Sequence, residues 1–257
     1  MALSWDMTSA ALRAPLRLPE TLRVDMTVAL GATHVQALRA RDISAKEACT
    51  LVDEQGRFFR ASVTRLDARS GEALVYEAMS GSTESPVELT LLCAVLGRQR
   101  MLTIIQKATE LGVARVIPVL SERSVPASGL AHEKAHAWPK QATRAARQCR
   151  RASLPEIREA TGLRSALTDP AFAGAALRVY LDDRAASSSA LPPLPAAGPS
   201  PHSVAFAVGP EGGWSDAERT LLTEQGATGL RIGGRVLRAE TAALVGLTLL
   251  QQAYGDF

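Results

Sequence analysis

The sequence predicts an α/β protein in two parts: a small β-barrel domain at residues 1–82 and a larger domain at residues 83–257, in which helices cover a parallel sheet. Three observations support this prediction. Short strand-like runs fill the first part, strand and helix patterns alternate in the second, and residues 80–86 separate them with no large apolar side chain. A chain of 257 residues is long enough to bury two modest cores.

Four short runs in the first part have the composition of β-strands. They are rich in apolar, β-branched and aromatic residues, and the Gly, Asp and Ser residues between them are typical of turns. Closely spaced strands of this kind predict a small barrel. The runs read TLRVDMTVAL, EACTLVD, RFFRASVTRL and EALVYEAM.

Strand-like and helix-like patterns alternate in the second part. The apolar run VELTLLCAVL precedes a segment in which Leu102, Ile105 and Leu111 have helical spacing, and the strand-like run ARVIPVL follows. This alternation predicts a parallel sheet covered by helices. Further strands are expected at ALRVYLD, SVAFAVG and GLRIGG.

The last predicted helix, AETAALVGLTLLQQAY, is almost wholly apolar over its first turns. A helix of this kind must be buried, either inside its own domain or against a second subunit. Residues 185–201, by contrast, are rich in Pro, Ser and Ala and predict an exposed, poorly ordered loop.

Composition and charge limit the classes of function. The formal net charge of +3 and the sequence pI of about 9.0 permit a polyanionic partner. The three cysteines lie far apart without a CxxC pair, which is typical of a reducing compartment. The N-terminal residues lack a continuous apolar signal segment, and no apolar run reaches membrane-spanning length. We therefore expect a soluble cytoplasmic protein that does not bind a membrane.

A glycine-rich loop, VGPEGGWSDAE, follows the predicted strand SVAFAV. Ser215 and Glu218 have the spacing of a capping box, so we expect a helix to begin there. A strand, a glycine turn and a helix N-terminus together present backbone N–H groups to a ligand. The loop matches neither the GxGxxG nor the Walker A pattern, and a tight turn without a ligand is the alternative.

A second loop, RIGGRVLRAETAAL, has the same order of features. Gly233 and Gly234 follow a predicted strand, and the apolar helix begins after them. Two such loops at the ends of neighbouring parallel strands would face one crevice. For Arg238 and Glu240, which lie near the helix start, a surface ion pair is the alternative to a functional role.

Together, GPEGGWSDAE and IGGRVLRAETA closely resemble the bacterial 16S rRNA (uracil-N3)-methyltransferase family of the knotted SPOUT methyltransferases. The resemblance continues in IQKATELGVARVIPVLSERSV and RQCRRASLPEI, and it spans most of residues 86–257. Nearer the N-terminus, HVQALRARD resembles part of the family's small RNA-binding barrel of PUA type.

The resemblance implies a SPOUT-type α/β domain after the PUA-like barrel, with a trefoil knot whose loops bind S-adenosylmethionine. It also implies a homodimer, and methylation of N3 of the uridine at position 1498 of 16S rRNA, either free or in the assembled 30S subunit. Glu110 and Arg123 are implied as further pocket members, with a structural ion pair as the alternative. The implied cofactor-binding residues are Gly209, Glu211, Gly212, Gly213, Ile232, Gly233, Leu237 and Ala242.

Methylation of N3 of uracil requires removal of an imide proton, whereas the sulfonium methyl donor is already electrophilic. The reaction therefore needs positioning and stabilisation of a uracil anion, and no metal is expected. Arg238 is the candidate for this stabilisation, because a guanidinium can donate to a carbonyl oxygen. Glu240 is either the base or a residue that orients Arg238. His132 and His136 have i, i+4 spacing, but with no third ligand evident nearby they do not predict a metal site.

Basic residues predict contacts with RNA. Four basic residues after Pro139 are spaced four, three and four positions apart, so they would share one face of a helix that starts there. We expect this face to contact RNA phosphates. A solvated charged face is the alternative. Arg39 and Arg41 are expected to make similar contacts from the first domain. The four residues of the helix are Lys140, Arg144, Arg147 and Arg151.

Two other functions stay open at this point. A SPOUT ribose 2′-O-methyltransferase acting on tRNA or rRNA would place the methyl group on the ribose and not on the base. A non-catalytic RNA-binding protein of the same fold would not bind S-adenosylmethionine.

Overall fold

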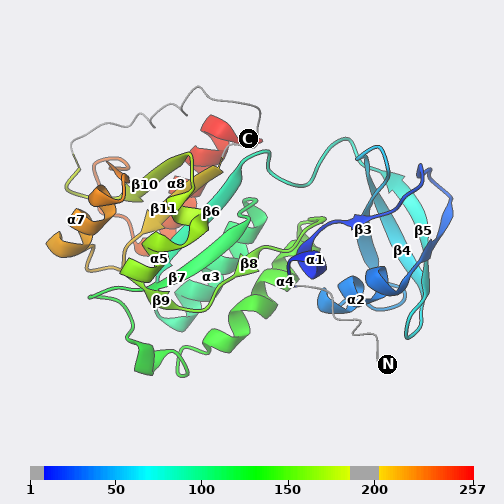
Figure 1. The fold of residues 1–257 in the computed structure, drawn as a ribbon, viewed down its shortest axis with the longest axis horizontal. Coiled ribbons are helices and arrows are strands. Elements are labelled where there is room, and N and C mark those ends of the chain that lie inside the picture. Colours follow the sequence, from blue (N-terminus) through cyan, green and yellow to red (C-terminus); the bar gives the residue numbers. More distant parts are fainter. Residues whose placement is uncertain (1–8, 186–202) are drawn as a thin grey trace. The chain divides into compact units, whose positions relative to one another are not determined.

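The structure, a computed structural model, describes residues 9–185 and 203–257 (Figure 1). The chain forms two compact units, of which unit 1 comprises Met1–Glu84 and Thr143–Leu154, and unit 2 comprises Ser85–Ala142 and Pro155–Phe257. Each unit has its own buried apolar core. Except for Ala185, the loop predicted at residues 185–201 lies outside the described residues.

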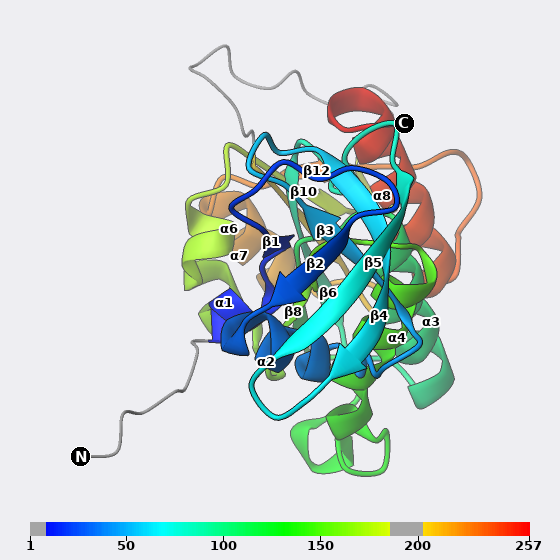
Figure 2. The same cartoon turned by 90° about the vertical axis from the view of Figure 1, so that its right-hand side faces the viewer.

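Unit 1 contains a five-stranded sheet in the order β1-β3-β4-β5-β2. All of its pairs are antiparallel except the short parallel pair of β1 with β3 (Figure 2). The four strand-like runs of the sequence correspond to β2 to β5. The strands are β1 (Leu16–Arg17), β2 (Thr27–Leu30), β3 (Ala48–Val52), β4 (Phe58–Leu66) and β5 (Gly71–Ala78), and the helices are α1 (Ser9–Arg13) and α2 (Ala32–Ala40).

The core of unit 1 follows from the alternation of side chains along its strands. In β5, Ala73 and Val75 are buried whereas Leu74 and Tyr76 are exposed, because successive side chains point to opposite faces of a sheet. Helix α2, which the sequence did not predict, adds Leu38 and neighbouring apolar residues to the same core.

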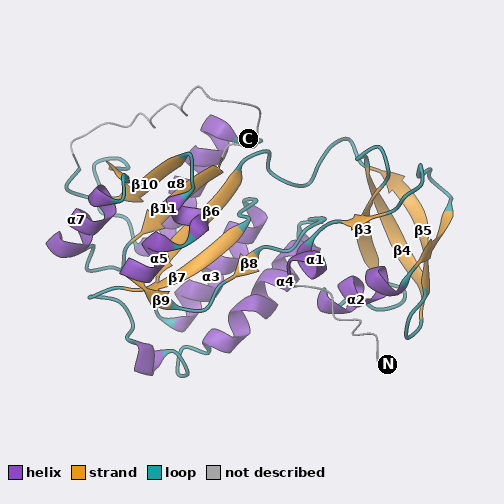
Figure 3. Ribbon diagram, viewed as in Figure 1, coloured by secondary structure: helices purple, strands orange, loops and turns teal. Residues whose placement is uncertain are grey.

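Unit 2 contains a parallel sheet in the order β12-β10-β11-β6-β7-β8, and β9 also pairs with β7 (Figure 3). The predicted alternation of strands with helices around a parallel sheet is confirmed. The strands are β6 (Glu88–Ala94), β7 (Arg115–Leu120), β8 (Glu156–Ile157), β9 (Thr161–Gly162), β10 (Leu177–Leu181), β11 (Ser203–Val208) and β12 (Thr228–Leu230).

Helices cover both faces of this sheet. Val204, Phe206 and Val208 of β11 belong to the core under α3 and α8, whereas Ala205 and Ala207 belong to the core under α5, α6 and α7. Both faces of the strand are buried, as expected of a parallel sheet. The helices are α3 (Arg98–Glu110), α5 (Leu163–Thr168), α6 (Pro170–Ala173), α7 (Asp216–Glu224) and α8 (Ala239–Tyr254), with 3₁₀ turns at Ala127–Gly129 and Ala135–Ala137.

Helix α8 is buried inside unit 2. A Cβ at Gly246 would lie 2.1 Å from Cζ of Phe206, so only glycine allows this helix to approach β11 so closely. Leu247 and Leu250 are fully buried against the same core. Of the helices among the described residues, none combines the length and apolar character needed to cross a bilayer.

Helix α4 (Trp138–Gln148) begins in unit 2 and ends in unit 1. It ends earlier than the basic pattern predicts. Arg150 has a φ of 65°, which helical residues do not adopt, and Arg151 follows it. The prediction that Arg151 shares a helix face with the other three basic residues is therefore wrong.

Candidate functional site

A cavity of about 430 Å³ lies where the parallel strands β10, β11 and β12 end. Because these strands run in the same direction, the loops that follow them meet at one edge of the sheet. The first glycine loop follows β11, the second follows β12, and the loop after β10 begins with Asp182 and Asp183.

All eight residues predicted for the cofactor pocket line this cavity. Each glycine loop follows a strand that can be recognised from the local sequence, but only the fold brings the two loops together. They are Gly209, Glu211, Gly212, Gly213, Ile232, Gly233, Leu237 and Ala242.

The first glycine loop is held from two sides. Gly213 has a φ of 67° and its amide donates to the carbonyl of Pro210 at 2.8 Å, so the loop turns tightly at a conformation that favours glycine. The ring of Trp214 packs against Gly209, where a Cβ would lie 3.1 Å from the indole. Arg123 supports Gly212 by donating to its carbonyl at 2.6 Å.

The predicted capping box at the start of α7 is present. The amide of Glu218 donates to Oγ of Ser215 at 3.2 Å, and the amide of Ser215 donates to Oε2 of Glu218 at 2.9 Å. The other oxygen of Glu218 accepts from the amide of Glu122 at 2.8 Å. The box therefore also connects the first glycine loop to the segment after β7.

The second glycine loop is open. Gly233 has a φ of 64°, and a Cβ at Gly233 or Gly234 would meet no atom within 4 Å. Past the glycines, Arg235, Val236 and Arg238 are exposed, and Val236 reaches 86% exposure. This loop therefore gives the cavity a cationic rim with one exposed apolar side chain.

Acidic residues that sequence reasoning missed lie at the end of β10. Asp182 is buried, and its Oδ1 accepts from Nε of Arg219 at 3.1 Å and from the amide of Arg184 at 3.0 Å. Asp183 is exposed and lies within 3.7 Å of Nη2 of Arg219. Their position after a parallel strand next to the glycine loops is the sequence signal that would have identified them.

Arg238 and Glu240 lie at the start of α8, outside the set of residues that line the cavity. Arg238 is the N-cap residue, and its carbonyl accepts from the amide of Ala242 at 2.8 Å. The Oε2 atom of Glu240 is buried and has no hydrogen-bond partner. Nε of Arg100, a residue that sequence reasoning also missed, lies 3.9 Å from it, and the same guanidinium forms an ion pair with Glu211.

Glu110 does not line the cavity. Its carboxylate accepts from Nζ of Lys107 at 2.8 Å and from Nε2 of Gln106 at 3.2 Å, so it forms an ion pair within α3. Arg123 contacts the first glycine loop from behind and does not line the cavity either. The pocket roles of both residues stay predictions.

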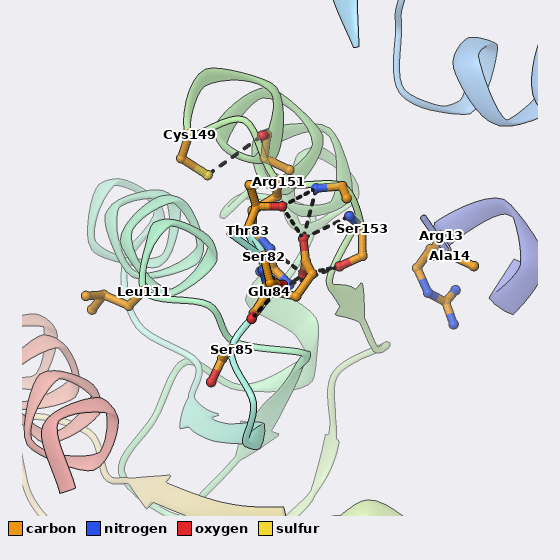
Figure 4. Close-up of polar contacts among 12 residues, drawn as sticks. Arg13, Ala14, Ser82, Thr83, Glu84, Ser85, Leu111, Cys149, Arg151 and Ser153 are labelled. Carbon is orange, nitrogen blue, oxygen red and sulfur yellow. Dashed lines mark hydrogen bonds and ion pairs between the residues drawn. The ribbon is translucent and has the colours of Figure 1, made fainter. Parts of the chain in front are cut away.

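The four basic residues predicted to share one RNA-binding helix face have different surroundings. Lys140 and Arg144 are exposed, whereas Arg147 pairs with Oε1 of Glu47 at 2.5 Å. Arg151 is only 5% exposed, and its Nη2 donates to Oε2 of Glu84 at 2.8 Å (Figure 4). Arg151 is therefore part of the interior of unit 1.

The two arginines predicted to contact RNA from the first domain also differ. Arg39 lies at the surface and donates to the carbonyl of Asp67 at 2.9 Å. Arg41 is buried, and its guanidinium donates to five carbonyl oxygens, including that of Ala14 at 2.6 Å. Burial lowers the pKa of Arg41 to about 10. The expectation that Arg41 contacts phosphates is wrong, because its donors are already used inside the protein.

Two of the three cysteines, Cys49 and Cys93, are buried. Burial raises the pKa of Cys49 and of Cys93 to about 12, so both stay neutral thiols. In the part of the chain that the structure describes, no three His, Cys, Asp or Glu side chains are placed to hold a metal ion. His132 is exposed and lies 3.1 Å from Glu133.

Comparisons with known proteins agree with this geometry. Residues 83–251 match the family described as RNA methyltransferase domain. The chain is 30% identical over 230 residues to the ribosomal RNA small subunit methyltransferase E of Synechocystis, an alignment that covers 89% of this chain and 74% of that protein. The corresponding protein of Bacillus subtilis is 30% identical over 180 residues, covering 69% of this chain and 70% of that protein.

A solved structure is similar over nearly its full length. The ribosomal RNA small subunit methyltransferase E of Neisseria gonorrhoeae, bound to S-adenosylmethionine, superimposes with a TM-score of 0.65 at 30% identity, covering 95% of this chain and 99% of that chain. The match thus extends across both units. This chain belongs to the ribosomal RNA small subunit methyltransferase E family.

Proposed function

We propose that this protein transfers the methyl group of S-adenosylmethionine to N3 of a uridine in 16S rRNA, at position 1498 in rRNA numbering. As a member of its family, the chain is an S-adenosylmethionine-dependent rRNA methyltransferase. The observation that carries the proposal is the cavity between two glycine loops at one edge of the parallel sheet.

The residues around the cavity fit S-adenosylmethionine. The cavity volume of about 430 Å³ lies within the range of small-molecule sites, roughly 300–1,000 Å³. Gly233 and Gly234 leave the main chain of the second loop open to a ligand, and Glu211 and Asp183 place carboxylates near a cofactor that carries two cationic groups. When bound, this cofactor supplies an electrophilic methyl group on a sulfonium centre.

The residues at the start of α8 are the candidates for chemistry at the uracil. Attack by N3 requires loss of the imide proton, and the negative charge then spreads onto the carbonyl oxygens. Arg238 is exposed next to the second glycine loop, where its guanidinium can donate to such an oxygen. Glu240 either takes the proton or orients the arginine, and its buried Oε2 atom has no hydrogen bond that would occupy it.

The RNA is proposed to contact the exposed basic residues. Lys140 and Arg144 lie on exposed positions of α4, and Arg39 lies at the surface of unit 1. Arg235 adds positive charge beside the cavity. Either free 16S rRNA or the assembled 30S subunit is compatible with these contacts, and both are found in the cytoplasm, where we propose that the enzyme acts.

We also propose a homodimer, formed through the apolar surface that α8 leaves half-buried. Leu247 and Leu250 pack inside unit 2 and offer no surface to a partner. Leu244, Val245 and Leu249 of α8 are only half-buried, and they leave apolar surface that a second copy can cover. Light scattering at micromolar concentration is expected to give twice the mass of one chain.

The trefoil knot of the C-terminal domain and the PUA-like barrel of the N-terminal domain are also part of this proposal. The two glycine loops that line one cavity are the segments expected to form the knot. The mainly antiparallel sheet of unit 1 provides the strands for the barrel.

Two experiments test the proposed function. Isothermal titration calorimetry with S-adenosylmethionine is expected to show saturable binding, and no binding would contradict the cofactor assignment. Methylation of 16S rRNA with a labelled methyl donor, followed by digestion to nucleosides, is expected to give 3-methyluridine. A 2′-O-methylated nucleoside would instead identify a ribose methyltransferase.

A further inference from the structure

Arg100 connects three segments that are far apart in the sequence. It lies in the first turn of α3, its Nη1 forms an ion pair with Oε1 of Glu211 in the first glycine loop, and its Nε lies 3.9 Å from Oε2 of Glu240 in α8. A single guanidinium therefore lies between a carboxylate that lines the cavity and a carboxylate beside it.

Arg100 does not form a hydrogen bond with Glu240. A separation of 3.9 Å is too long for a hydrogen bond, and Oε2 of Glu240 is buried without any other donor. A buried carboxylate oxygen without a donor is unfavourable, so an arrangement that brings Nε of Arg100 closer would be stabilised. Glu211 opposes that arrangement because it holds the other side of the same guanidinium.

A cationic ligand changes this balance. Glu211 lines the cavity and is about half-exposed, so a cation bound there is attracted to its carboxylate and competes with Arg100. Among the described residues, Glu211 and Glu240 are the carboxylates that pair with Arg100, so Glu240 remains when Glu211 turns to the ligand. Arginine suits such an exchange because its planar guanidinium holds five N–H donors in a rigid fork that can face two carboxylates, whereas lysine presents one compact charge.

We propose that Arg100 exchanges its partner from Glu211 to Glu240 when a cationic ligand fills the cavity, and thereby positions the Glu240 carboxylate only in the loaded protein. This inference rests on the proposed function, because the cationic ligand is S-adenosylmethionine. Arg100 is then a positioning residue that couples occupancy of the cavity to Glu240.

The exchange makes a prediction for binding alone. Calorimetry is performed with the wild-type chain, Arg100→Ala, Glu240→Gln and the double variant. Glu240→Gln is expected to weaken S-adenosylmethionine binding about threefold to tenfold, because Arg100 loses the partner to which it would move. In the Arg100→Ala background the same substitution should change affinity less than about twofold. An equal loss in both backgrounds, or no loss in either, would overturn the exchange.

A neutral ligand provides the matched control. 5′-Methylthioadenosine shares the adenosine part of the cofactor but has neither the sulfonium nor the ammonium group. Its affinity should be the same in the wild-type chain and in Glu240→Gln, because it does not compete for Glu211. If Glu240→Gln weakens both ligands equally, the cation is irrelevant and the exchange is wrong.

A rate measurement separates positioning from binding. Arg100→Ala is expected to bind S-adenosylmethionine at least as tightly as the wild-type chain, since Glu211 loses a competitor, yet to transfer the methyl group about ten- to a hundredfold more slowly in single turnovers. Arg100→Lys keeps the charge and should recover part of this rate. Arg98→Ala removes an exposed arginine from the same helical turn and should leave both quantities unchanged. If Arg98→Ala lowered the rate of methyl transfer as much as Arg100→Ala, the effect would come from the loss of one positive charge alone, and the positioning role of Arg100 would be overturned.

Failure of the exchange is distinguishable from failure of the proposed function. If the wild-type chain does not bind S-adenosylmethionine, the proposed function is wrong and the exchange falls with it. If the wild-type chain binds the cofactor and methylates rRNA while Glu240→Gln has no effect on affinity, the function stands and the exchange alone is overturned.

Discussion

Nη1 of Arg123 donates a hydrogen bond to the carbonyl oxygen of Gly212 at 2.6 Å, so the segment after β7 supports the first glycine loop from behind. The side chain also fills the space next to this glycine, because a Cβ at Gly212 would lie 3.0 Å from Cδ and 3.3 Å from Cβ of Arg123. The conformation of the loop therefore depends on a residue that does not itself line the cavity.

Gly212→Val is expected to abolish measurable S-adenosylmethionine binding while leaving the fold intact. The new side chain would press against Arg123 and displace the loop, because a Cβ alone would already lie 3.0 Å from Cδ of that arginine. Calorimetry measures the affinity, and circular dichroism checks the fold.

Arg123→Ala serves as the matched variant. It removes the hydrogen bond to Gly212 without adding bulk, and the loss of about 1 kcal/mol for an exposed charged donor corresponds to roughly fivefold weaker binding. Full cofactor affinity in a folded Gly212→Val protein would contradict the placement of this loop in the site.

Arg238→Ala should slow methyl transfer far more than it weakens cofactor binding. The arginine precedes α8 beside the second glycine loop but does not line the cavity, which separates it from the cofactor. Loss of a donor aimed at developing charge typically lowers the rate about a hundred- to a thousandfold. Single-turnover rates at saturating RNA and cofactor measure this, and a near-normal rate would remove Arg238 from the chemistry.

The shape of the first glycine loop could be predicted from sequence because its signals are local, whereas the eight cofactor-binding residues followed from the resemblance to a known family. A strand, a glycine loop and a helix start follow one another directly at Val208 to Ser215, and the capping box with Glu218 fixes where the helix begins. The longer strands were predictable because apolar runs between turn residues can be recognised locally, whereas the two-residue strands β1, β8 and β9 were not predicted. Helix α2 was missed because its burial depends on the sheet of unit 1 and its own apolar pattern is weak.

The surroundings of charged residues could not be predicted, because their partners lie far away in the chain. Glu84 precedes Arg151 by 67 residues, and Arg41 donates to a carbonyl 111 residues later, at Ala152. The spacing of the basic residues predicted that Arg151 lies on an RNA-binding face, but the fold buries its side chain. Arg100 was missed for the converse reason, since nothing near it in the sequence indicates that Glu211 and Glu240 will meet it.

Arg144→Ala and Arg151→Ala are expected to differ, although the sequence pattern groups them. Arg144 is exposed, so its loss should weaken RNA binding and lower the slope of log affinity against log salt concentration by about one unit, with unchanged stability. Arg151→Ala leaves the largely buried Glu84 carboxylate without its cation and should lower the free energy of unfolding by about 3 kcal/mol. Urea unfolding and salt-dependent binding assays test the pair. Equal stability losses in both variants would contradict this division.

The last prediction concerns Glu84 and acid (Figure 4). Burial raises the pKa of this carboxyl, but the charge of Arg151 and hydrogen bonds from Arg151 and Ser153 outweigh burial, so the folded-state pKa lies below the ordinary value of 4.5. A carboxyl whose pKa falls on folding stabilises the folded state fully above its unfolded pKa. That contribution shrinks as the pH falls from about 4.5 through the folded-state pKa.

Glu84→Gln removes this titration while keeping the shape of the side chain. The wild-type chain is expected to exceed the variant in free energy of unfolding by about 1–3 kcal/mol at pH 7, and the difference should narrow as the pH falls from 5 to 3. Urea unfolding of both proteins at matched pH values measures the difference, and the other carboxyls titrate in both proteins and cancel. A difference that stays constant down to pH 3 would mean that Glu84 stabilises unit 1 through hydrogen bonds that glutamine cannot make, and not through its charge on Arg151.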